Sequence, residues 1–187
     1  MHHWGRRESD KAPDWDFRAM AAMFRVYDFF RERRQTFDRR LGAFAIRPGD
    51  TVVDYGCGIG GYLEAASRLV GPGGRVYAVD VQPLAIEAVR KKIARRNLGN
   101  ITPVLARGYH CEVPGSSADL IYALDMLHAM RNPDLFLAEC RRIVKPEGRL
   151  IVDDGHQSRS ETRRRIEGSG QWRIDKETED AVECRPK

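Results

Sequence analysis

The chain has 187 residues, of which 42% are hydrophobic and 32% charged, and its formal net charge is +5. This composition is typical of a soluble globular domain that is long enough to bury a core. No apolar run approaches the roughly 20 residues that span a bilayer, and the polar first ten residues lack the apolar stretch of a signal peptide. We therefore expect a single soluble protein domain without a membrane span.

The cysteines and the basic residues exclude further classes. The four cysteines lie far apart, which fits neither a disulfide framework nor a C-x-x-C metal site. We therefore expect reduced thiols, a cytoplasmic location and no bound metal. Basic residues gather at 31–40, 90–96 and 163–165, which would permit a nucleic-acid partner. The last two groups lack interleaved aromatic residues for base stacking, so we interpret them as solvated helix faces.

Aromatic residues are concentrated at the front of the chain, where nine of the sixteen precede position 45. Residues 15–30 have helical periodicity, and one helix can either pack against a core or cover a substrate pocket as a lid. We predict an N-terminal tail and helical lid over residues 1–44, and a ligand-binding domain over residues 45–187. The side chains expected to line the pocket are Phe17, Met20, Phe24 and Tyr27.

A glycine-rich turn follows the first predicted strand. Residues 51–54 form a β-branched run that indicates a buried strand, and residues 56–61 contain four glycines. A helix with apolar residues at helical spacing is predicted over residues 62–70. Strand, glycine turn and helix together form a unit that presents backbone N–H groups to an anionic or polar ligand.

The glycine spacing fits two motifs at once. Gly56, Gly58 and Gly61 match the G-x-G-x-x-G pattern of dinucleotide sites. Gly56, Gly58 and Gly60 match D-x-G-x-G-x-G, counted from Asp54. The glycine spacing by itself therefore does not decide which class of cofactor the turn binds.

Residues 75–80 indicate a second buried strand, which ends at Asp80. An acid at this position can accept hydrogen bonds from both hydroxyls of a ribose. It supports an adenosine-containing ligand without choosing between cofactors. The alternative role for Asp80 is that of a helix N-cap, although Gln82 could serve as the cap.

The remaining predicted elements alternate between strand and helix. Strands are expected at 101–106, 118–124 and 149–154, and helices at 83–93, 133–143 and 158–167. Residues 107–117 should form a loop, residues 145–148 a turn, and residues 171–174 and 181–184 an antiparallel hairpin. This order predicts an α/β fold: a doubly wound, mostly parallel, seven-stranded sheet that ends in a C-terminal antiparallel hairpin.

Three segments resemble the class I S-adenosylmethionine-dependent methyltransferases, and are similar in particular to the small-molecule branch with the quinone-biosynthesis enzymes. Residues 52–60 resemble motif I, and residues 76–80 resemble the acid motif of the second strand. Residues 118–128 and 137–148 resemble the block that follows, which dehydrogenases lack. The resemblance implies a Rossmann-like methyltransferase fold and S-adenosyl-L-methionine as cofactor.

The same resemblance assigns the cofactor site. Asp54 and the glycine loop would hold the methionine end, and Asp80 would hold the ribose. Arg107 departs from the family pattern, which commonly has an acid there, and a guanidinium cannot accept a hydrogen bond from adenine. The complete expected set is Asp54, Tyr55, Gly56, Cys57, Gly58, Gly60, Asp80, Val81, Arg107, Gly108 and Leu124.

Three polar residues follow the fourth and fifth strands, at the edge where ligands bind. His156 is the leading candidate for a catalytic residue because it follows a strand end and a flexible glycine. His128 could instead pack a helix, and Asp125 could be a helix cap. Methyl transfer needs a base only when the acceptor carries a proton of high pKa.

These features favour methyl transfer to a small-molecule acceptor. The Asn/Asp-Pro-Pro-aromatic motif of nucleic-acid base methylation is absent, since residues 124–127 read Leu-Asp-Met-Leu. Two alternatives remain at this point: a nicotinamide-dependent oxidoreductase, and a non-catalytic regulatory protein that binds S-adenosylmethionine. The sequence leaves the acceptor atom and the oligomeric state open.

Overall fold

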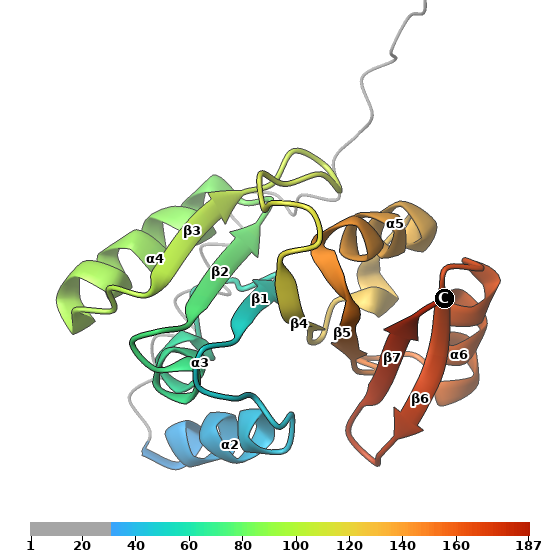
Figure 1. The fold of residues 1–187 in the computed structure, drawn as a ribbon, viewed down its shortest axis with the longest axis horizontal. Coiled ribbons are helices and arrows are strands. Elements are labelled where there is room, and N and C mark those ends of the chain that lie inside the picture. The colour runs from blue at the N-terminus through green and yellow to red at the C-terminus, as the bar shows by residue number, and fades with distance from the viewer. Residues whose placement is uncertain (1–30) are drawn as a thin grey trace, which may run out of the picture.

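The computed structural model describes residues 31–187, which form one seven-stranded sheet with helices on both faces (Figure 1). The helices are α2 (Arg31–Gly42), α3 (Leu63–Val70), α4 (Pro83–Arg96), α5 (Pro133–Ile143), α6 (Arg159–Gly168) and the short 3-10 helix η1 (Leu127–Ala129). The strands are β1 (Thr51–Tyr55), β2 (Arg75–Asp80), β3 (Ile101–Leu105), β4 (Ala118–Ala123), β5 (Val144–Val152), β6 (Trp172–Glu177) and β7 (Val182–Pro186).

The strand order across the sheet is β3-β2-β1-β4-β5-β7-β6. The first five strands in this order pair in parallel. β7 pairs antiparallel with both β5 and β6. The predicted fold is therefore confirmed, including the antiparallel hairpin at the C-terminal end.

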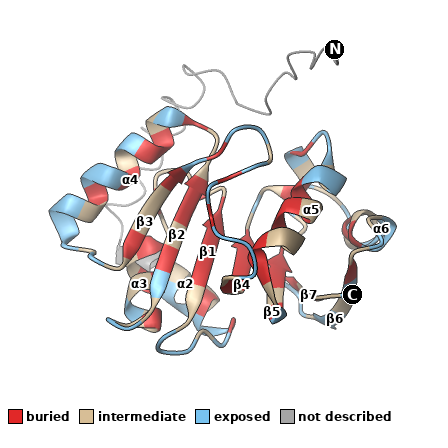
Figure 2. Cartoon of the chain, turned by 45° about the horizontal axis from the view of Figure 1, so that its top comes forward, coloured by how far each residue is buried: buried red, intermediate tan, exposed pale blue. Residues whose placement is uncertain are grey.

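Alternate side chains of the central strands enter two core layers. Val52 packs in the layer that contains residues of α2, α3 and α4, whereas Val53 packs in the layer of α5 and α6. This alternation follows from the two-residue period of a strand. Figure 2 shows buried positions running through β1 and β4, and burial on both faces explains why these strands are almost continuously apolar.

The region ahead of β1 differs from the expectation in one respect. α2 is a separate helix that the sequence analysis did not identify, and Leu41 at its end is fully buried beside α3. Phe44 follows it into the same layer. The predicted helix over residues 15–30 lies outside the described residues, so the division into a lid over 1–44 and a domain over 45–187 stays a prediction.

β5 begins at Val144, five residues before the predicted start of that strand. Ala118 pairs with Val144 and Leu120 pairs with Arg149, so residues 145–148 lie within a shift of register. The turn predicted there is an irregularity inside the strand. Gly148 occupies a crowded position, because a Cβ on it would lie 2.6 Å from Cγ2 of Val144.

Candidate active site

The carboxyl ends of β1, β2, β4 and β5 meet at one edge of the sheet, because these strands are parallel. From β1 the chain continues to β2 and β3 on one side, and β4 and β5 lie on the other. Such a switch of direction opens the crevice in which α/β sheets bind ligands. The polar residues expected from the sequence follow these strands.

The glycine turn between β1 and α3 has left-handed backbone at Gly56, Gly58 and Gly60, with φ of 83°, 52° and 78°. A side chain at Gly56 would overlap the sulfur of Met126, and one at Gly60 would lie 2.6 Å from Cδ1 of Leu63. These two glycines are required by packing within the protein. A Cβ on Gly58 would meet no heavy atom within 4 Å, so the loop is open to a ligand at Gly58.

Most N–H groups of this turn already have acceptors within the protein. Those of Gly56 and Cys57 donate to the carbonyl of Val79 at 2.8 and 3.0 Å. Gly58 N donates to Oδ2 of Asp80 at 2.9 Å, and Gly60 N donates to the carbonyl of Cys57 at 2.8 Å. The N–H groups of these four residues are therefore directed at acceptors of the protein and not at an anion.

Asp54 lies at the inner side of the turn and is only 4% exposed. Its Oδ2 has no hydrogen-bond partner within residues 31–187. Burial raises the pKa of Asp54 to about 7, the hydroxyl of Tyr122 opposes this rise, and the nearby charges of Asp80 and Lys92 act in opposite directions. A buried carboxylate with one oxygen that lacks a partner fits a cationic or hydrogen-bond-donating ligand.

Asp80 connects the end of β2 to the glycine turn. Its Oδ1 accepts the N–H of Gln82 at 2.8 Å, and its Oδ2 accepts the N–H of Gly58. Burial raises the pKa of Asp80, while these two N–H groups lower it. Each carboxylate oxygen can accept a second hydrogen bond, so the residue fits the expected contact with two ribose hydroxyls.

Lys92 is a residue of this site that the sequence analysis placed wrongly, on a solvated basic face. It is only 7% exposed, and its Nζ donates to the carbonyl of Gly60 at 2.7 Å. The signal was present in the spacing, since Lys92 follows the buried Ala85 and Val89 along one stripe of α4. A buried ammonium thus stabilises the glycine turn through the carbonyl of Gly60.

The other expected cofactor contacts fall into two groups. Val81 and Leu124 are half-buried at the ends of β2 and β4. Arg107 is exposed, and its N–H donates to the carbonyl of His110 at 2.8 Å across a turn that contains Gly108, whose φ is 63°.

Two further expected contacts have side chains engaged within the protein. The Tyr55 hydroxyl donates to the carbonyl of Tyr109 at 2.7 Å, so this side chain holds the 107–110 turn. Burial raises the pKa of the Cys57 thiol well above its usual range, which keeps the thiol protonated and unreactive.

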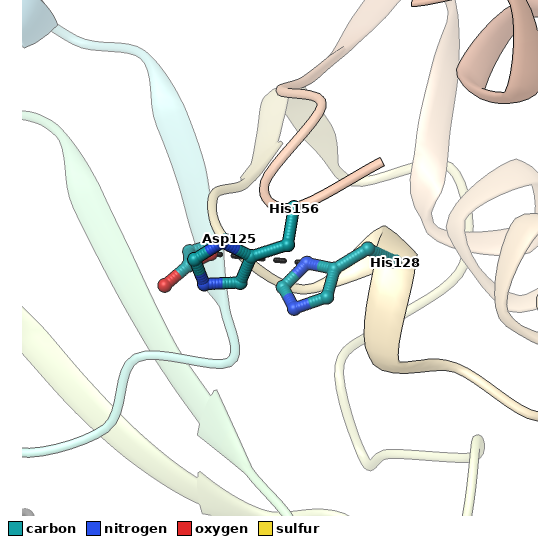
Figure 3. Close-up of side chains that lie close together, drawn as sticks. All are labelled: Asp125, His128 and His156. Carbon is teal, nitrogen blue, oxygen red and sulfur yellow. Dashed lines mark ion pairs between the residues drawn. The ribbon is translucent and has the colours of Figure 1, made fainter. Parts of the chain in front are cut away.

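Asp125, His128 and His156, the three residues predicted to be catalytic, converge on the other half of the edge (Figure 3). Nδ1 of His128 lies 3.8 Å from Oδ1 of Asp125. The rings of His128 and His156 meet edge to face, with centroids 4.9 Å apart. The segments after β4 and β5 therefore bring together side chains that are about 30 residues apart in sequence.

The backbone of Asp125 is held in a strained conformation. Its φ is 58°, which costs a non-glycine residue about 1–3 kcal/mol. Its N–H donates to Oδ1 of Asp153 at 2.7 Å, and Oδ2 of Asp153 accepts from Arg40 of α2 at 2.6 Å. Arg40 also donates to the hydroxyl of Tyr62 at 3.1 Å. Asp153 therefore positions Asp125, and this role was not foreseen.

Met126 joins the two halves of the site. It is the residue after Asp125, and its side chain lies against the α-carbon of Gly56. The cluster of Asp125, His128 and His156 is thereby placed beside the glycine turn, with no element of the sheet between them.

We predict that Asp54 makes the stability of the free protein depend on pH. Because its pKa is raised from 3.8 to about 7 in the folded state, the folded state binds a proton in this interval that the unfolded state has released. The free energy of unfolding should therefore fall as the pH rises from about 4 to about 7, by up to about 1.4 kcal/mol per pH unit. Urea unfolding of the wild type and of Asp54→Asn at pH 5 and pH 8 measures the difference.

Asp54→Asn should lose this part of the pH dependence, because an amide does not titrate. Asp175→Asn is the matched control: its carboxyl is on β6, and its pKa is lowered by Arg185 and Arg173, so it stays ionised above pH 5. Equal pH dependence in the wild type and in Asp54→Asn would contradict the prediction.

Comparisons with known proteins agree with this geometry. Residues 53–152 match the family model of the methyltransferase domain. The chain is 35% identical over 106 residues to nocamycin O-methyltransferase of Saccharothrix syringae, and the aligned segment covers 56% of this chain and 37% of that protein. It is 33% identical over 108 residues to a ubiquinone/menaquinone biosynthesis C-methyltransferase of Cupriavidus pinatubonensis, with 57% of this chain and 44% of that protein covered. The chain thus spans less than half the length of these relatives.

Solved structures share the fold. A SAM-dependent methyltransferase from Aquifex aeolicus superposes with a TM-score of 0.80 at 24% identity, over 95% of this chain and 100% of that one. Coclaurine N-methyltransferase, bound to N-methylheliamine and SAH, superposes with a TM-score of 0.58 at 24% identity, over 65% of this chain and 35% of that one. Because the family model matches more than half of the residues, the chain belongs to the methyltransferase domain family, and its fold is that of the S-adenosylmethionine-dependent methyltransferases.

Proposed function

We propose that this methyltransferase acts on a small-molecule acceptor that binds beside Asp125, His128 and His156. The observation that carries the proposal is the contact of Met126 with Gly56, which places this cluster next to the glycine turn. An acceptor held by the cluster would lie next to the cofactor. The relatives named above methylate oxygen, carbon or nitrogen by their names, so the acceptor atom is not part of the proposal.

The cofactor half has the properties that S-adenosylmethionine requires. When bound, this cofactor supplies a methyl group on a positively charged sulfur. Asp54 and Asp80 would hold its polar groups, and Gly58 leaves open space for its approach. Two carboxylates favour a cationic ligand over a pyrophosphate, and four N–H groups of the turn already have acceptors within the protein. Both features disfavour the nicotinamide-dependent alternative.

The acceptor half supplies groups that bind and orient. Displacement of a methyl group depends mainly on placing the acceptor and excluding water. His156 is exposed and His128 is half-buried, and a neutral imidazole can accept a proton near pH 7. Asp125 lies close enough to orient the ring of His128. These three residues are the proposed catalytic set.

We also propose a location for the enzyme and a role for its N-terminal segment. Within residues 31–187, no helix is long and apolar enough to cross a membrane. The four cysteines are all buried and unbonded to each other, which suits the reducing cytoplasm that we propose as its location. We also propose that residues 15–30 cover the acceptor, although this segment lies outside the described residues.

Asp80→Asn should weaken binding of S-adenosylhomocysteine, because one carboxylate oxygen becomes an amide donor where ribose hydroxyls need acceptors. Hydrogen bonds to a charged group contribute about 1.5–3 kcal/mol, so the dissociation constant should rise roughly ten- to a hundredfold. Calorimetric titration measures it, with Asp175→Asn as a control that should bind normally. An unchanged affinity in folded Asp80→Asn would remove this residue from the site.

Methyl transfer itself is tested with labelled S-adenosylmethionine and a panel of hydroxylated, amine-bearing and quinone-like small molecules. For an accepted compound that carries a proton, His156→Ala should lower kcat by about 10²–10⁴-fold and leave the affinity for S-adenosylhomocysteine unchanged. Tight cofactor binding without transfer to any acceptor would instead support the non-catalytic regulatory protein.

Removal of residues 1–30 tests the proposed lid. If these residues cover the acceptor, the shortened chain should fold, bind S-adenosylhomocysteine and lose transfer. If they only pack against the core, the cooperative unfolding transition should be lost, because each buried aromatic residue removed costs about 3–5 kcal/mol. Thermal unfolding and the transfer assay separate the two outcomes, and full activity would contradict both.

A further inference from the structure

Two imidazoles and one carboxylate share a small volume at the ends of β4 and β5. Asp125, His128 and His156 each offer a donor atom, and these atoms all lie within 4.8 Å of one another. The close-up in Figure 3 shows the three side chains close together, with His128 on the short helix η1. Asp125 and His156 are exposed, so the cluster is reachable from solvent.

The spacing of the donor atoms suits a bound cation better than a direct hydrogen bond. Nδ1 of His128 lies 3.8 Å from Oδ1 of Asp125, whereas a hydrogen bond would bring them within about 3.2 Å. This Nδ1 is buried and has no hydrogen-bond partner within residues 31–187. Two ligands that each lie about 2.0–2.2 Å from one metal ion are themselves about 3–4 Å apart.

The backbone conformation at Asp125 and the absence of a side chain at Gly155 bring the donor atoms together. Asp125 is held at φ 58° by the hydrogen bond from its N–H to Asp153, and Asp153 is in turn fixed by Arg40. A side chain at Gly155 would overlap Nδ1 of His128, so the glycine lets this ring approach the loop that carries His156. The backbone of Asp125 and the ring of His128 are thus positioned by contacts within the protein.

We propose that Asp125, His128 and His156 form a binding site for a divalent transition-metal ion, with Zn²⁺ as the reference ion. Two imidazoles and one carboxylate are a donor set of catalytic metal sites, and imidazole selects such ions over Mg²⁺ and Ca²⁺. This departs from the expectation from sequence that the protein binds no metal. The reason is that the three ligands are separated in the sequence and meet only in the fold.

The role of the ion rests on the proposed function, and with the ion bound His128 and His156 would serve as its ligands in place of accepting a proton. Three protein ligands leave at least one coordination position open. Because the cluster is the part of the site assigned to the acceptor, the ion would bind an oxygen or nitrogen of that molecule. The acceptor would then be a compound with a hydroxyl, carboxylate or amine group, and not a hydrocarbon.

The test uses the full chain after treatment with a chelator, titrated with Zn²⁺ by calorimetry and with Co²⁺ by visible absorption. We expect one ion per chain in the wild type. His128→Ala and His156→Ala should each lower the affinity at least about tenfold and change the Co²⁺ spectrum. His156→Cys should restore binding, because it returns a ligand atom at the same position.

Matched controls address the other histidines of the chain. The double variant His2→Ala/His3→Ala and the single variant His110→Ala remove imidazoles outside the cluster, and both should keep the wild-type affinity and spectrum. If affinity is lost in these controls and kept in His128→Ala and His156→Ala, the proposed site is wrong. Absence of stoichiometric binding in the folded wild type would overturn it as well.

Two further measurements keep this proposal distinct from the proposed function. The metal-free chain should bind S-adenosylhomocysteine with the same affinity as the Zn²⁺-loaded chain, since the cofactor half holds no ligand of the ion. If neither form binds S-adenosylhomocysteine, the result counts against the proposed function. With an acceptor from the labelled-methyl screen, Zn²⁺ should lower KM for that acceptor. A transfer reaction indifferent to Zn²⁺ would overturn the coordinating role of the ion.

Discussion

The glycine turn after β1 is held almost entirely from within the protein, and the site depends on that support. The carbonyl of Val79 accepts two of its N–H groups, Asp80 accepts a third, and Nζ of Lys92 on α4 donates to the carbonyl of Gly60. Two neighbouring elements, β2 and α4, therefore fix one loop. Since a buried ammonium that loses its partner is costly, Lys92 makes the position of the turn a requirement of folding and not only of ligand binding.

The acceptor half is supported in a similar way by the buried ion pair of Arg40 and Asp153. Asp153 is 7% exposed and accepts hydrogen bonds from both Arg40 and the backbone of Asp125. Because both side chains are largely buried, loss of either partner would leave the other charge without compensation. α2 thus acts on a site to which it contributes no expected ligand. The same helix reaches the glycine turn, where a Cβ on Gly61 would lie 3.1 Å from Cζ of Phe37.

The sequence predicts most of the sheet because the strands are apolar runs and the helices have apolar residues at helical spacing. β1, β2 and β4 are buried on both faces, and the turns between elements contain glycine or proline. The expected acids of the site could be found because they lie at or just after the carboxyl ends of strands, and parallel strands bring those ends together.

Contacts between distant segments could not be predicted in this way. Arg40 and Asp153 are 113 residues apart, and nothing local in either segment indicates their pairing. Lys92 differs, since its position on the buried stripe of α4 was visible, and charge alone suggested exposure. The roles of Gly56 and Gly60 also changed, because their neighbours are side chains of the protein.

The two halves of the site are built on different strands and anchored by different pairs. Asp54, Asp80 and Lys92 belong to β1, β2 and α4, whereas the cluster of Asp125, His128 and His156 follows β4 and β5. Met126 against Gly56 is the contact that sets their separation. The loops after β4 and β5 can therefore change in sequence, and with them the groups offered to an acceptor, while the support of the cofactor half stays as it is. A methionine suits this junction, because an unbranched and polarisable side chain adapts to small shifts between two surfaces.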